Sequence, residues 1–168
     1  MSTDDRDTDD RSFQALVGSL DPAMYVVTVA SRGERSGCLV GFATQASIDP
    51  PRFLVCLSKA NHTFGVAATA TLLGVHALRD DDHGLAQRFG HETGDEVDKF
   101  EGLDVVDGPA GTPLLRGANP FVGRVIDRFD CGDHVATLLE PVGGSVTRED
   151  ERPLGLHDVD DVEPGHPA

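Results

Sequence analysis

The sequence predicts a mainly β protein of one domain, an antiparallel β-barrel with a few short helices at its periphery. The chain has 168 residues, which corresponds to about one domain. Its apolar residues gather in short β-branched runs, separated by turns that draw on 19 glycines and 10 prolines. Long helical patterns do not alternate with these runs, so a βαβ repeat with a parallel sheet is not favoured.

Strands are expected where β-branched and apolar residues run together or alternate. Six segments meet this description: residues 24–30, 38–43, 53–58, 72–78, 121–130 and 134–142. We interpret the first two as a hairpin with a long polar loop at residues 31–37. In the fifth, Phe121 and Val125 alternate with Arg124, which predicts one wetter face.

Short helices are expected at three places, each with a capping or charge signal. Ser12 can cap a helix with Phe13 on its apolar side, and Asn61 or Thr63 can cap a helix over residues 64–70. The carboxylates of residues 80–82 can start a third helix, whose apolar face is Leu85, Ala86 and Phe89. We expect a disordered acidic tail at residues 1–11, the domain at residues 12–155, and a polar extension at residues 156–168.

The charge balance is strongly acidic and argues against two classes of partner. Asp and Glu number 29 and Lys and Arg 14, which gives a net charge of −15, and only two residues are lysines. A chain with so few cations is a poor candidate for nucleic-acid phosphates or for an anionic membrane surface. The composition fits either a cytosol of high salt or a genome of high GC content, and both explanations stay open.

The three cysteines, Cys38, Cys56 and Cys131, are far apart in sequence and odd in number. They predict reduced thiols in a cytoplasmic protein rather than a disulfide framework. No apolar run approaches the roughly 20 residues of a membrane span. The polar N-terminal segment lacks the apolar core of a signal peptide.

The standard catalytic and nucleotide-binding motifs are missing from the sequence. Cys131-x-x-His134 has the spacing of metal ligands, but no second such pair accompanies it, so we expect no metal site. His76 lies inside an apolar strand, which is typical of a histidine whose hydrogen bonds are satisfied in the core or at an interface.

Two segments place polar groups between apolar strands, and both are candidates for ligand binding. The first is residues 43–51; the second is residues 58–63, where a strand ends and a helix begins. The second segment offers hydroxyl, amide and helix N–H donors suited to a phosphate. Capping explains Asn61 or Thr63, whereas it does not explain one of only two lysines, Lys59, at this point.

These segments resemble the flavin reductase family, whose members have an FMN-binding split β-barrel. The resemblance rests on G-C-L-V-G-F-A-T-Q-A-S-I-D-P-P at residues 37–51 and F-L-V-C-L-S-K-A-N-H-T at residues 53–63. It continues in order with A-Q-R-F at 86–89, D-K-F at 98–100, G-D-H at 132–134 and P-L at 153–154, so it covers about residues 13–155.

The resemblance implies a homodimer that holds FMN or FAD near the subunit interface, with NADH or NADPH as the reductant. By position, His134 would be the catalytic residue beside the nicotinamide. The residues implied to hold the flavin are Thr44, Gln45, Ala46 and Ser47 at the isoalloxazine, Ser58, Lys59, Asn61, His62 and Thr63 at the phosphate, and Lys99 and Phe100 at the edge of the cofactor or the partner subunit.

The implied function is NAD(P)H-dependent flavin reduction, with the reduced flavin available to a monooxygenase. The alternatives are an FMN-binding electron carrier without NAD(P)H turnover, and a split barrel that binds haem or a deazaflavin. The chain departs from the family at Leu39, Gly41 and Gln45, where the family usually has Thr, Ser, and Ser or Thr. It has no Trp and a single Tyr, so aromatic stacking on a flavin would come from Phe.

Overall fold

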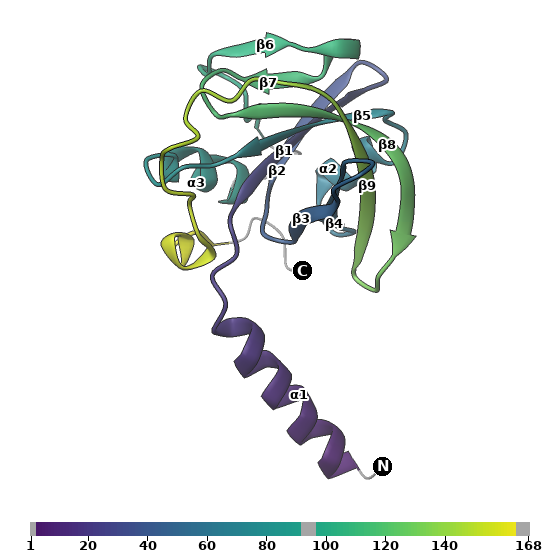
Figure 1. The fold of residues 1–168 in the computed structure, drawn as a ribbon, viewed down its shortest axis with the longest axis vertical. Helices are drawn as coiled ribbons and strands as arrows, with labels where there is room; N and C mark the ends of the chain where they lie inside the picture. Colours follow the sequence, from purple (N-terminus) through teal and green to yellow (C-terminus); the bar gives the residue numbers. More distant parts are fainter. Residues whose placement is uncertain (1–2, 92–96, 164–168) are drawn as a thin grey trace.

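The computed structural model describes residues 3–91 and 97–163, and its main feature is one curled antiparallel sheet (Figure 1). Seven strands form this sheet in the order β2-β1-β5-β8-β9-β4-β3. Their bounds are β1 Tyr25–Ser31, β2 Glu34–Val40, β3 Ala43–Ser47, β4 Arg52–Ser58, β5 Leu72–Ala77, β8 Pro120–Asp130 and β9 His134–Gly144. A separate hairpin pairs β6 (Val105–Asp107) with β7 (Pro113–Leu115). The prediction of a mainly β, antiparallel barrel is confirmed.

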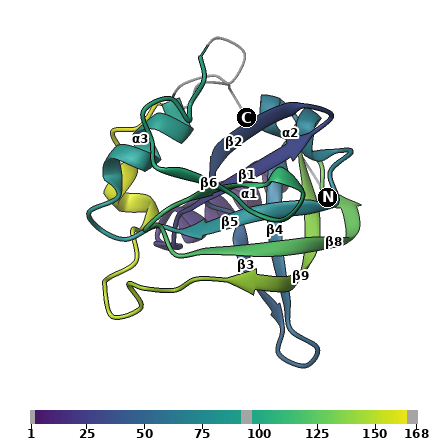
Figure 2. The same ribbon diagram turned by 90° about the horizontal axis from the view of Figure 1, so that it is seen from above.

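The helices lie at the periphery of the barrel (Figure 2). They are α1 (Thr3–Gly18), α2 (His62–Ala67) and α3 (His83–His91), with two 3₁₀ turns, η1 (Pro109–Gly111) and η2 (Leu156–Val159). Asn61 caps α2, because its side-chain oxygen accepts the N–H of Thr63 at 2.9 Å. Of the two capping residues considered, Asn61 therefore has this role, and Thr63 lies inside the helix.

The β1–β2 connection is tighter than the long loop expected at residues 31–37. Ser31 pairs directly with Glu34, and the two residues between them, Arg32 and Gly33, both have positive φ. A two-residue turn of this kind matches the twist of the strands, so pairing continues through polar residues that resemble a loop. The strands β3, β6 and β7 were not expected either, because they are short or lack an apolar run.

The N-terminal helix begins at Thr3, whereas the expected helix begins at Ser12 after a disordered tail. Low hydrophobicity argues against burial, but a helix satisfies its own backbone hydrogen bonds without a core. Figure 1 shows α1 projecting away from the barrel. At the other end, η2 buries Val159, so packing of the domain continues past the boundary expected at residue 155.

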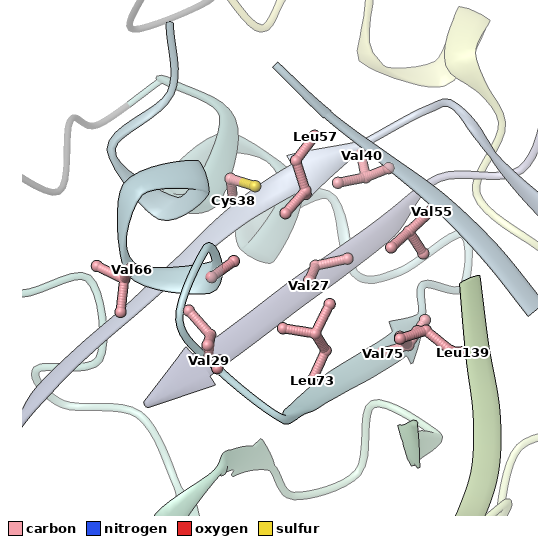
Figure 3. Packing of buried hydrophobic residues seen from close by; sticks show 12 residues of the cluster. Val27, Val29, Cys38, Val40, Val55, Leu57, Val66, Leu73, Val75 and Leu139 are labelled. Atoms are coloured by element: carbon pink, nitrogen blue, oxygen red, sulfur yellow. The ribbon is translucent and has the colours of Figure 1, made fainter. Parts of the chain in front are cut away.

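The core has two parts that use both faces of β1. Val27 and Val29 face the interior of the curled sheet, where side chains from β2, β4, β5 and β9 surround them (Figure 3). Val26 faces the other way, into a second cluster with Phe89 of α3 and Phe100. A strand that is buried on both faces has a continuous apolar run instead of an alternating one, as the sequence of β1 does.

His76 on β5 connects the sheet to the β6–β7 hairpin. The N–H of Leu115 donates to its Nε2 at 2.9 Å, so Nδ1 carries the proton and donates to the carbonyl of Val26 at 3.0 Å. The side chain is fully buried. The expectation of a histidine satisfied within the core is confirmed.

Candidate functional site

The candidate site occupies one face of the neighbouring strands β3, β4 and β9. Ser58 on β4 lies directly opposite His134 on β9, and Leu54 lies opposite Thr44 on β3. Residues that pair directly, and residues two apart on a strand, point to the same face of a sheet. Thr44 and His134 therefore share a face. Their partners on β4, Leu54 and Ser58, are four residues apart, which corresponds to about 13 Å along the strand.

Two cavities open along this face and meet at its centre. The larger has a volume of about 590 Å³ and is mostly apolar, with Thr44 and Leu54 in its wall. The smaller, of about 230 Å³, has Ser58, Asn61 and His134 as its polar groups. Both are bounded by the same four residues, Gly41, Phe42, Cys56 and Leu156. The larger volume lies in the range of small-molecule sites, roughly 300–1,000 Å³.

Phe42 lies in the connection between β2 and β3, where the two cavities meet. Its side chain is 62% exposed, and its ring centroid is 5.1 Å from that of His134 with the planes inclined by 52°. Its carbonyl accepts the N–H of Cys56 at 2.8 Å, which fixes its backbone to β4. The lack of Trp and the single Tyr predicted stacking from a phenylalanine, but nothing in the motif singled out Phe42.

His134 is held by the residue before it. Its Nδ1 lies 2.8 Å from Oδ1 of Asp133, and this hydrogen bond holds the pKa of the Asp133 carboxyl below its usual range. An ionised carboxylate only accepts, so Nδ1 carries the proton and Nε2 is left for other partners. The backbone N–H of Lys59 donates to the carbonyl of Asp133 at 2.9 Å, which joins the end of β4 to the β8–β9 turn.

The five residues implied at the phosphate are separated by the structure. Ser58 and Asn61 face the smaller cavity with His134. Lys59 Nζ instead donates to Asp130 Oδ2 at 2.7 Å, and this contact lowers the pKa of the Asp130 carboxyl.

The remaining two point elsewhere. His62 Nε2 lies 2.6 Å from Oε1 of Glu34 on β2. The hydroxyl of Thr63 is buried and lies 2.8 Å from the hydroxyl of Ser36. The hydroxyl of Thr63 is therefore used within the protein. The polar end of the smaller cavity consists of Ser58, Asn61 and His134.

The segment implied at the isoalloxazine is also only partly in the cavities. Thr44 lines the larger one, whereas Gln45, Ala46 and Ser47 do not contribute to the wall of either. These three continue along β3, which is the edge strand of the sheet. Gln45 and Ala46 are exposed, as expected for side chains on an open edge.

Lys99 and Phe100 lie away from both cavities, in the second core cluster. Lys99 Nζ donates to the carbonyls of Gly37 at 3.2 Å and Phe89 at 3.1 Å. Phe100 is 4% exposed and packs edge-on against Phe89 at 5.5 Å between centroids. These contacts fasten α3 to β2, and neither residue lines either cavity.

Within the described ranges, one group of carboxylates has the spacing of metal ligands: Asp80, Asp81 and Glu151. The Arg148 guanidinium donates to both Asp81 and Glu151. Arg152 lies 3.7 Å from Asp80, so each of the three carboxylates is paired with an arginine, and the group is a structural ion network. No helix in the described part of the chain is long and apolar enough to cross a membrane.

The chain is similar to several known proteins. The chain is 28% identical over 151 residues to the reductase subunit of a flavin-dependent monooxygenase from Rhodococcus jostii, covering 87% of this chain and 73% of that protein. The NADH:FAD oxidoreductase of Streptomyces globisporus C-1027 matches with a TM-score of 0.76 at 25% identity, over 84% of this chain and 85% of that one.

A flavin reductase domain protein from Arthrobacter sp. FB24 matches over 95% of this chain and 96% of its own, with a TM-score of 0.79 and 25% identity. The chain also covers 50% of one longer solved chain, with a TM-score of 0.76. The family model for the flavin reductase like domain matches residues 17–163, which is most of the chain. This protein therefore belongs to the flavin reductase family and has its split-barrel fold.

Proposed function

We propose that this protein reduces FMN or FAD with NADH or NADPH, and that the reaction takes place in the cleft formed by the two cavities. The observation that carries the proposal is one face of the sheet with an apolar wall at Thr44 and Leu54 and a polar end at Ser58 and His134. The relatives named as flavin reductases support the choice of reaction.

The residues of the cleft fit a flavin. An apolar cavity of about 590 Å³ suits a planar ring, and the hydroxyl of Ser58, the amide of Asn61 and the imidazole of His134 suit a polar chain or an amide. A bound flavin would supply the redox chemistry, because it accepts two electrons from a reduced nicotinamide and passes them on. The protein supplies binding and orientation, with His134 held by Asp133 at one end of the cleft.

The test uses the purified protein with added FMN or FAD. We expect bound flavin to lose its visible absorption rapidly on anaerobic mixing with NADH or NADPH in a stopped-flow instrument. Dithionite serves as the control that reduces any bound flavin. Reduction by dithionite alone would contradict the proposal and identify an electron carrier, and a Soret or deazaflavin spectrum after purification would identify a different cofactor.

We further propose that a second copy of the chain completes the site and that a monooxygenase takes up the reduced flavin. α1 carries Phe13 and Leu16 with more than half of each side chain exposed, and its end at Val17 and Gly18 borders the larger cavity. A second copy would cover this apolar surface. Light scattering after size exclusion should give twice the chain mass, and a monomer with full activity would contradict the dimer.

Lys59 is expected to favour flavins that carry a phosphate. It is one of two lysines, the other being buried, and its ammonium is 39% exposed beside Asp130. A bound phosphate would replace Asp130 as the partner of Lys59. Because an exposed ion pair contributes little free energy, Lys59→Met should weaken FMN binding by about fivefold. Riboflavin, which has no phosphate, should bind as before.

The matched control is Arg116→Met, which removes the same charge from an exposed ion pair with Asp104 outside both cavities. Titrations of both variants followed by quenching of flavin fluorescence provide the measurement. Equal weakening of FMN and riboflavin by Lys59→Met would show that the lysine does not recognise the phosphate.

A further inference from the structure

We infer that Phe42 is the surface on which the planar ring of the ligand stacks, and that it positions this ring beside His134. The identity of the ring as an isoalloxazine rests on the proposed function. Phe42 lines both cavities. Among the described residues that line them, only Phe42 and His134 have an aromatic ring.

The exposure of Phe42 is the first observation. Other phenylalanines near this part of the sheet are used for packing: Phe53 and Phe121 meet edge-on at 5.2 Å and pack, partly buried, against the main core cluster. The ring of Phe42 is 62% exposed instead, at the junction of two cavities. An exposed aromatic ring in a concave apolar site is a surface that a ligand can cover with a gain in burial.

The second observation is how Phe42 is held. The hydrogen bond from the Cys56 N–H to its carbonyl fixes the backbone against the middle of β4. Cys56 lies between Leu54 and Ser58 on the face that carries the site. The backbone of Phe42 therefore lies beside Cys56, midway along β4 between the row of Leu54 and Thr44 and the row of Ser58 and His134.

The third observation is the orientation of the ring. Its plane is inclined by 52° to that of His134 at a centroid distance of 5.1 Å, so the two rings touch without lying flat on each other. Aromatic pairs favour offset stacking or edge contacts at such distances. In the described part of the chain no aromatic ring stacks parallel to Phe42, and a planar heteroaromatic ring is the ligand chemistry that fits its face.

The test separates the aromatic face from simple bulk. Phe42→Leu keeps an apolar side chain and removes the π-surface, and Phe42→Tyr keeps the ring. The probe is lumiflavin, which has the isoalloxazine but no ribityl phosphate, with binding followed by quenching of its fluorescence. We expect Phe42→Leu to weaken lumiflavin and FMN alike by about five- to tenfold, and Phe42→Tyr to bind as the wild type.

The matched control is Phe129→Leu, which changes another half-exposed phenylalanine, 48% exposed and outside both cavities, and should leave lumiflavin binding unchanged. Phe42→Ile repeats the aliphatic substitution, and circular dichroism confirms that each variant is folded. Wild-type affinity for lumiflavin in Phe42→Leu or Phe42→Ile overturns the role of Phe42 and leaves the proposed reaction intact. No binding of lumiflavin to the wild type, with FMN still bound, overturns the role of Phe42 alone, and no binding of either ligand overturns both.

Discussion

Replacing His134 by alanine is expected to lower the rate of flavin reduction by NADH about 100-fold, with less than about threefold change in flavin affinity. The side chain lies at the polar end of the cleft, and its Nδ1 is engaged by Asp133 at 2.8 Å. Its Nε2 can therefore contact the nicotinamide or stabilise charge that develops during the reaction. Interactions of this kind act on the rate more than on binding, since they are strongest in the transition state.

The pairing with Asp133 makes a second variant informative. Asp133→Asn removes the charge that holds the imidazole but keeps a hydrogen-bonding side chain of similar shape. Because Asp133 is 70% exposed, its hydrogen bond with His134 contributes little free energy, and we expect a rate loss of only about two- to fivefold. A loss as large as that in His134→Ala would place Asp133 in direct contact with the reacting groups.

His83→Ala is the control for His134→Ala. His83 also pairs with an aspartate, Asp161 at 2.8 Å, and it lines neither cavity. Its removal should leave flavin reduction unchanged. Stopped-flow rates and flavin titrations on the same preparations separate the two effects. A large loss of flavin affinity with an unchanged rate in His134→Ala would make His134 a binding residue.

The apolar runs of the sequence predicted the frame of the site because they are also the core of the fold. Val27 and Val29 of β1, and Val55 and Leu57 of β4, are almost completely buried. β-branched and apolar side chains favour strands because they pack well on a buried sheet surface. Their runs in the sequence therefore locate the strands. The cap at Asn61 was predictable for a similar reason, since it depends on residues two positions apart.

The directions of the polar side chains could not be predicted in the same way. Residues 58–63 form one cluster in the sequence, yet Ser58 faces the cavity while Lys59 turns to Asp130 on β8. The alternation of a strand sends neighbours to opposite faces, and the partner of Lys59 is 71 residues away. The same limit applies to Lys99, which donates to backbone carbonyls that no side-chain pattern reveals.

Acid should destabilise this protein through His76 once the pH falls below about 6.5. Burial lowers the pKa of His76 to about 4, and the hydrogen bond to the Val26 carbonyl opposes this shift only in part. The ordinary value in an unfolded chain is about 6.5. The neutral form thus stabilises the fold fully above pH 6.5, and this contribution is lost as the pH falls from about 6.5 towards 4.

The expected loss is about 3 kcal/mol of unfolding free energy, from a difference of roughly 2.5 pKa units at 1.36 kcal/mol each. Urea unfolding at pH 7, 6, 5 and 4.5 measures it. His76→Gln should be less stable at pH 7, because an amide fits the pair of Val26 and Leu115 less well, but it should lack this decline.

The control His157→Gln changes a histidine that is 46% exposed and should keep the wild-type decline. An equal decline in wild type and His76→Gln would show that His76 does not sense the pH. The expected decline has a geometric reason: protonation would leave Nε2–H facing the N–H of Leu115 at a fully buried side chain, with neither donor satisfied. The β6–β7 hairpin, which this contact fastens to β5, should be the first element to detach.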